Sequence, residues 1–187
     1  MKFTLHYRGP LLANGRPQHK HDLRCVIHRQ LKTLWQRQAL RDIGDMVDIA
    51  NDPSGPHGIL IRPAFGFYFA PLVAASVHAV AEIEIMLLRP EAPGGLITQG
   101  GDVDNRLKTL FDALTIPRHS NQIPGGISLS VDETPFFCLL EDDNLITSVQ
   151  VRTEHLLEPD VAPNDVELFI DVRTAITRPT FANLVFA

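Results

Sequence analysis

One segment near the middle of the chain alternates apolar and polar side chains, and this alternation restricts what can surround it. Residues 79–90 read AVAEIEIMLLRP. Successive side chains of a strand point to opposite faces, so the pattern predicts a half-buried strand that ends at Pro90. Glu82 and Glu84 are expected to face solvent, because glutamate is rarely buried without a partner. The apolar face is formed by Ala81, Ile83, Ile85 and Leu87.

Weaker patterns supply the elements around this strand. Alternation predicts further strands at 2–8, 145–152 and 166–173. Residues 59–62 and 66–75 are expected to form short strands or one strand interrupted at Pro63. Apolar residues spaced by three and four predict helices at 22–41, with Asp22 as N-cap, and at 105–114. The order of strand, helix, strands, helix, strands predicts an α+β fold in which helices pack on a mixed β-sheet. Residues 115–138 contain several Pro and Gly residues and predict an irregular excursion.

Length and composition restrict the class of protein. With 187 residues, the chain is expected to form one domain over 1–187 with a substantial core. Cys25 and Cys138 are too isolated for a disulfide framework or a zinc site, so we expect a reducing, cytoplasmic location. No apolar signal segment is visible at the N-terminus, and the apolar stretch 67–88 contains Pro71 and two glutamates. That stretch therefore predicts buried strands rather than a membrane span.

Charge is distributed unevenly along the chain. Residues 1–41 contain nine Lys and Arg residues and one acid, a net charge of +8, whereas the whole chain has −5. Such asymmetry favours a basic surface for a polyanion, and the alternative is a solvated basic helix paired with acidic neighbours. Arg24, His28 and Lys32 follow one another at four-residue steps and predict a basic ridge on the first helix.

Acidic residues gather where the second predicted helix begins. Asp102 and Asp104 stand two residues apart, which in an extended stretch puts both carboxylates on one side. Lys108 follows Asp104 by four residues and would project from the same helix face. Asp143 precedes the strand at 145–152 and is expected to reach the same place. Carboxylates held together attract a divalent cation, and a nearby lysine can stabilise developing charge on a phosphoryl group.

A simpler interpretation of the same residues stays open. Asp104 can serve as a helix N-cap with Asp102 exposed to solvent. Asp142 and Asp143 taken alone are typical of a turn.

Two segments resemble the RusA-like family of Holliday junction resolvases. The first is Asp102-Val-Asp104-Asn105-x-x-Lys108, followed by Asp112-Ala-Leu, and the second is Asp142-Asp143-Asn-Leu-Ile146. The resemblance covers roughly residues 80–172 and implies a homodimer that cuts four-way DNA junctions with Mg²⁺ or Mn²⁺. It implies that Asp102, Asp104 and Asp143 bind the metal and that Lys108 is the catalytic lysine. The candidate DNA-binding residues are Arg24, His28, Lys32 and Arg106.

Two competing hypotheses remain at this level. One is a catalytically inactive DNA-binding or scaffold relative of the same fold, favoured by the net acidity and by the long interval before Asp143. The other is a nucleotide-handling enzyme in which Asp102 and Asp104 hold a metal–phosphate. The sequence has no recognisable nucleotide-binding loop to support it.

Overall fold

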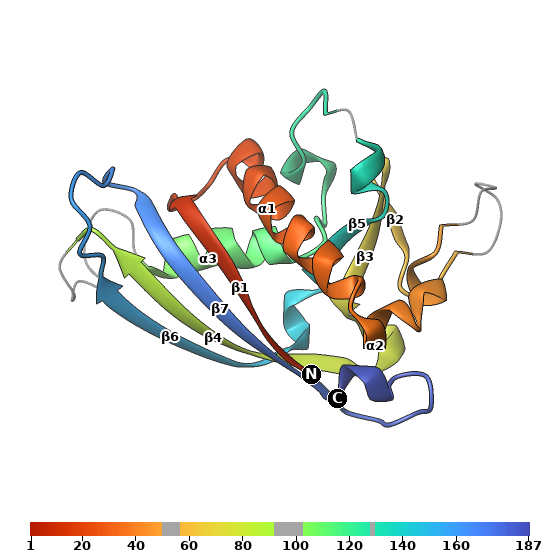
Figure 1. Cartoon of the computed structure of the whole chain (residues 1–187). Coiled ribbons are helices and arrows are strands. Elements are labelled where there is room, and N and C mark those ends of the chain that lie inside the picture. Colours follow the sequence, from red (N-terminus) through yellow and green to blue (C-terminus); the bar gives the residue numbers. More distant parts are fainter. Residues whose placement is uncertain (50–56, 92–102, 128–129) are drawn as a thin grey trace.

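The computed structural model describes residues 1–49, 57–91, 103–127 and 130–187, and it has the expected α+β fold with two mixed sheets (Figure 1). Its helices are α1 (Pro17–Trp35), α2 (Gln38–Arg41) and α3 (Val103–Leu114). Its strands are β1 (Lys2–Pro10), β2 (Arg62–Ala64), β3 (Phe67–Val73), β4 (Ala79–Arg89), β5 (Phe136–Leu140), β6 (Ile146–His155) and β7 (Asp165–Ile176). Short 3₁₀ turns connect them, of which η3 (Ser120–Gln122), η4 (Val131–Glu133) and η5 (Asp143–Leu145) matter for the site.

The larger sheet has the strand order β1-β7-β4-β6. Within it β4 runs antiparallel to β7 and parallel to β6, with Glu82 opposite Ser148 and Arg89 opposite His155. The expected alternation of β4 is confirmed, because Ala81, Ile83, Ile85 and Leu87 are buried and the two glutamates between them are exposed. Strand β7 alternates in the same way, with Val166, Leu168, Ile170 and Val172 fully buried.

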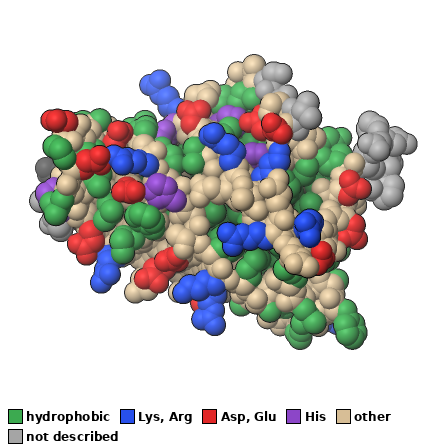
Figure 2. Space-filling model, viewed as in Figure 1, with side chains coloured by type: hydrophobic (Ala, Val, Ile, Leu, Met, Phe, Trp, Pro, Cys, Tyr) green, Lys and Arg blue, Asp and Glu red, His purple; other side chains and the backbone are tan. Residues whose placement is uncertain are grey.

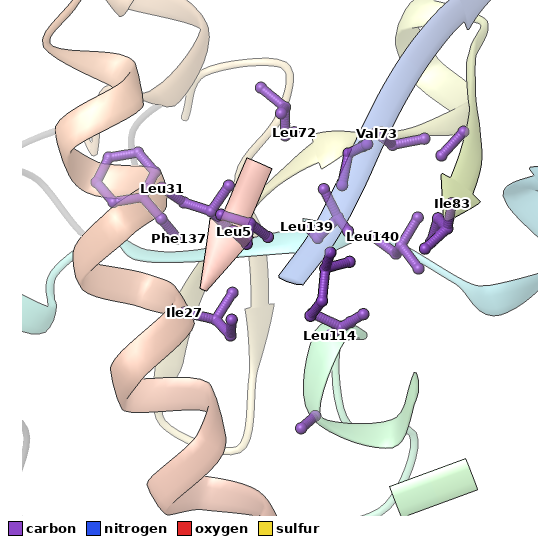
Figure 3. Packing of buried hydrophobic residues seen from close by; sticks show 14 of the residues in the cluster. Leu5, Ile27, Leu31, Leu72, Val73, Ile83, Leu114, Phe137, Leu139 and Leu140 are labelled. Carbon is purple, nitrogen blue, oxygen red and sulfur yellow. The ribbon is translucent and has the colours of Figure 1, made fainter. Parts of the chain in front are cut away.

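The core fills the space between the apolar face of this sheet and the elements that cover it. Helices α1 and α3 lie on the same side of the sheet, together with the second sheet, β2-β3-β5 (Figure 1). In Figure 3, Ile27 and Leu31 of α1 approach Phe137 and Leu139 of β5, and Leu114 of α3 lies beneath β5. Burial of these side chains ties the first helix to a strand more than 100 residues later.

Several boundaries differ from the sequence predictions. The helix predicted to reach residue 41 ends at Trp35, and the strand predicted at 59–62 is displaced to β2. Helix α1 begins at Pro17, before the predicted start at Asp22, so Asp22 is not an N-cap. Proline is well suited to the first helical turn, because its missing N–H would have no partner there. The predicted excursion ends earlier than expected, because Phe136, Phe137 and Cys138 belong to the buried strand β5. A continuous apolar run in a strand that is covered on both faces shows no alternation.

The stretch 67–88 is confirmed as buried strands, since it holds most of β3 and β4. Among the described residues, none of the helices is long and apolar enough to cross a membrane.

Candidate acidic site at the two ends of helix α3

The first half of the predicted site lies where α3 begins. Asp104 is exposed in the first turn, and Lys108 is exposed one turn later. Asp102 lies outside the described residues. The buried guanidinium of Arg106 binds Glu91, with Nη2 3.1 Å from Oε1. Because Glu91 closely follows β4, this ion pair fixes the beginning of α3 at the carboxyl end of β4.

The second half of the predicted site lies at the opposite end of α3. Leu140 forms a parallel bridge with Thr115, just after the last turn of the helix, and Asp143 lines a small hollow together with Asp112. Asp104 and Asp112 are eight residues apart on the helix, which corresponds to about 12 Å along its axis. Within one chain, therefore, Asp104 and Asp143 are not brought together.

The direction of β6 explains why the expected meeting does not occur. Strand β6 runs parallel to β4, so it begins at the end of the sheet where β4 also begins. Helix α3 starts at the other end, where β4 finishes. A parallel connection must return the chain to the end of the sheet where the strands begin, and α3 forms part of this return path. Asp143 stands at the end of that return path.

The three acids of the run 141–143 have different environments. Glu141 accepts from Arg62, with Nε 2.5 Å from Oε1, and from the backbone N–H of Ala75. Asp142 accepts from the backbone N–H of Asn144 at 3.0 Å, and this bond, with Arg118 beside it, lowers the pKa of its carboxyl. Glu141 and Asp142 therefore hold the local structure.

Asp143 is 54% exposed at its side chain, and Arg118 is its partner among the described residues. A single nitrogen of Arg118, Nη2, lies 2.5 Å from Asp143 Oδ1 and 2.9 Å from Asp142 Oδ2. The guanidinium thus occupies the position of a shared cation between two neighbouring carboxylates. Oxygen donors arranged in this way fit the preferences of Mg²⁺ and Mn²⁺.

The candidate DNA-binding residues of α1 are largely structural, which corrects the predicted basic ridge. Arg24 is 2% exposed and donates to the carbonyls of Asp112 and Gln122, at 2.8 and 3.2 Å. Burial lowers its pKa to about 10. These bonds join α1 to the last turn of α3 and to η3, the turn that follows Arg118.

His28 joins α1 to β5. It is 3% exposed, and its Nδ1 accepts from the backbone N–H of Phe137 at 2.8 Å. Its Nε2 lies 3.1 Å from the carbonyl of Asp132. A carbonyl can only accept, so Nε2 carries the proton and the ring is neutral. Lys32 also binds Asp132, through both the carbonyl and the carboxylate. Arg106, bound to Glu91, is equally unavailable to DNA.

The exposed cations of the N-terminal region are different residues. Arg29, Arg37 and Arg41 are exposed, and within the described part of the chain none of them forms an ion pair. In Figure 2, Lys and Arg side chains lie across the middle of the face on which α1 runs. The sequence held a signal for this distinction, because Arg24 and His28 each stand three residues before an apolar residue of the buried face, Ile27 and Leu31.

Among the described residues, no group of three or more His, Cys, Asp and Glu side chains is gathered so as to hold a metal ion. Compared with known protein families and with curated protein sequences, the chain has no match. Sequence reasoning did not foresee Arg118, since a single arginine in an irregular segment carries no periodic signal.

Proposed function

We propose that the protein is a metal-dependent endodeoxyribonuclease that acts on branched DNA. The observation that carries the proposal is the exposure of Asp104, in the first turn of α3, and of Asp143, in the turn between β5 and β6. Asp143 in particular accepts from Arg118, and among the described residues no backbone N–H donates to its carboxylate. The likeness of these two segments to the RusA-like resolvases supports the same function.

Each residue has a distinct role in this proposal. Asp102, Asp104 and Asp143 would hold Mg²⁺ or Mn²⁺, which supplies an activated water and neutralises charge on the scissile phosphate. Lys108 is exposed on the same helix as Asp104 and would stabilise negative charge that develops on a phosphate oxygen. Arg29, Arg37 and Arg41 would contact the DNA backbone away from the acids, since phosphate contacts dominate such affinity.

A homodimer suits this chemistry for two reasons. Paired cuts on a four-way junction match the symmetry of a two-fold dimer. The separation of about 12 Å between the two halves of the site along α3 also leaves room for a second copy to bring its own residue 143 close to Asp104. A dimer then contains two equivalent sites, each built from two chains.

The experiment that tests the function uses a labelled four-way junction and a matched linear duplex, with Mg²⁺ and then Mn²⁺. We expect the wild type to nick the junction selectively. Asp104→Asn, Asp143→Asn and Lys108→Ala should each lower the cleavage rate by about 100-fold or more, since each removes a group that acts on the phosphate. Circular dichroism should show unchanged folding, because all three side chains lie at the surface.

Mixing variants adds a test of the shared site. If Asp104→Asn and Asp143→Asn subunits form a mixed dimer, one of its two sites keeps all its acids and nicking returns. Cleavage by the wild type without recovery in the mixture would assign each site to one chain. A junction that is bound but never cut would contradict the nuclease function.

That last outcome would favour the second candidate function, a DNA-binding protein without nuclease activity. Its support is the ion pair of Arg118 with Asp142 and Asp143, which neutralises the acids without a metal ion. In that case Arg118→Gln should leave junction affinity unchanged and should not produce cleavage.

A further inference from the structure

Arg118 combines a fixed backbone with an exposed side chain. Its backbone N–H donates to Oε1 of Gln122 at 2.6 Å, and the backbone N–H of His119 donates to the same oxygen at 3.2 Å. The carbonyl of Gln122 accepts in turn from the buried guanidinium of Arg24 at 3.2 Å. These bonds tie residues 118–122 to α1, while the side chain of Arg118 is 53% exposed. The side chain can therefore change its partner without movement of the backbone.

The guanidinium of Arg118 uses only part of its donor set. Its Nη2 lies 2.5 Å from Oδ1 of Asp143, and 3.0 and 2.9 Å from the two carboxylate oxygens of Asp142. Among the described residues, no acceptor binds its Nε or Nη1. Arginine has five N–H donors in a planar fork that matches the oxygens of a carboxylate or a phosphate. Most of these donors are thus available to a second anion.

A divalent ion on Asp143 would compete directly with this contact. Mg²⁺ binds a carboxylate oxygen at about 2.0–2.1 Å, and Nη2 of Arg118 already lies 2.5 Å from one of the two carboxylate oxygens. Two cations so close to one carboxylate repel each other. The ion pair opens easily, because both side chains are more than half exposed and exposed ion pairs contribute little to stability.

The charges at this end of α3 also favour an exchange of cations. Asp112 is already neutralised by Lys20, whose Nζ lies 2.6 Å from its Oδ2. Asp142 and Asp143 together carry two negative charges against the single positive charge of Arg118, so one negative charge is left over. A divalent ion added beside Arg118 would reverse the sign of this excess. A divalent ion that displaces Arg118 would balance the two acids.

We propose that Arg118 is a phosphate-binding residue, which is held by Asp142 and Asp143 in the metal-free protein and is released when a divalent ion binds Asp143. The released guanidinium stays near the ion, because the backbone of residue 118 is fixed. The anion that suits such a pair of cations is a DNA phosphate, with one oxygen on the metal ion and another on Arg118. This inference rests on the proposed function, which supplies both the metal ion and the DNA.

The first measurement is the affinity for Mn²⁺ without DNA, followed by the electron paramagnetic resonance signal of the free ion. Arg118→Gln should lower the Mn²⁺ dissociation constant about two- to fivefold, because the ion no longer has to break an exposed ion pair. Arg152→Gln is the matched control, since it removes the same charge from another exposed ion pair, with Glu154 on β6. It should leave the dissociation constant unchanged.

The second measurement is the affinity for a labelled four-way junction in the Lys108→Ala background, which keeps the acids and slows any cleavage. With a chelator present, adding Arg118→Gln should weaken binding no more than adding Arg152→Gln does. With saturating Mn²⁺, it should weaken binding about tenfold or more, the effect of one lost hydrogen bond to a charged group. Arg118→Lys, which keeps the charge without the fork, should recover part of this loss.

Mn²⁺ binding that is unchanged or weaker in Arg118→Gln would overturn the proposal, since Arg118 would then not compete with the ion. Equal junction affinities of the Arg118→Gln and Arg152→Gln proteins in Mn²⁺ would overturn it too, because Arg118 would not bind the phosphate. Neither measurement depends on cleavage. If both expected results appear and the wild type never cuts the junction, the nuclease function fails and the role of Arg118 stands.

Discussion

Helix α1 and the segment after it carry two sets of cationic or ionisable side chains that look alike in the sequence and differ in what they do. Arg24 and His28 are buried and hold α1 to α3, η3 and β5. Arg29, just one residue after His28, is exposed, as are Arg37 and Arg41 beyond the end of the helix. The net charge of +8 over residues 1–41 therefore overstates the basic surface that can meet a polyanion. Burial, rather than charge, separates structural cations from available ones.

The largest difference between the two sets should appear in stability. Arg24→Ala removes a buried guanidinium and leaves the carbonyls of Asp112 and Gln122 without this donor. We expect the free energy of unfolding in urea to fall by about 2–5 kcal/mol, because each buried acceptor that loses its donor costs about 1–3 kcal/mol. The exposed Arg29→Ala on the same helix should change it by about 0.5 kcal/mol or less. Equal losses for the two variants would refute the distinction.

A smaller difference should appear in the dependence of stability on pH. Burial is the main cause that lowers the pKa of His28, and the nearby Lys32 lowers it further, while the bond to the carbonyl of Asp132 and the charge of Glu133 raise it. Burial also lowers the pKa of His21. The unfolded chain therefore binds more protons than the folded one as the pH falls below about 6.5. The contribution of these two histidines to the free energy of unfolding is fully present above that pH and is lost on acidification.

His28→Gln tests this pH dependence, because glutamine can accept from the N–H of Phe137 and does not titrate. The difference in the free energy of unfolding between wild type and variant should narrow by about 1 kcal/mol between about pH 8 and pH 5.5, the scale of one buried hydrogen bond. Thermal or urea unfolding at several pH values measures it. His155→Gln, at an exposed position, should keep the wild-type profile. A constant gap for His28→Gln would mean that His28 makes no contribution to the pH dependence.

The smallest effect concerns the exposed set. Arg37→Gln and Arg41→Gln should each weaken junction binding only severalfold, while the slope of log affinity against log salt falls by about one for each phosphate that is no longer bound. Fluorescence anisotropy over a range of salt concentrations measures both quantities. Unchanged slopes would show that Arg37 and Arg41 do not contact DNA phosphates, so that the DNA-binding surface lies on another face of the protein.

The fold could be predicted further than the site. Alternation predicted β4 and β7 with the correct faces, because a strand with one covered face has a period of two. Strand β5 escaped the same reasoning, since all five of its residues are buried. For the site, the spacing of Asp104 and Lys108 placed both on one exposed helix segment. Whether Asp143 could join them depended on strand direction, which local spacing does not encode.

The sequence by itself determined the α+β class, the start of α3 beside Asp104, and the acid pair before β6, because these depend on neighbours within a few residues. Only the tertiary structure decided that Arg24 and His28 are buried, that Arg118 neutralises Asp143, and that β6 is an open edge among the described residues. Each of these facts joins residues far apart along the chain. Such contacts are selected by packing of the whole core, and no local pattern records them.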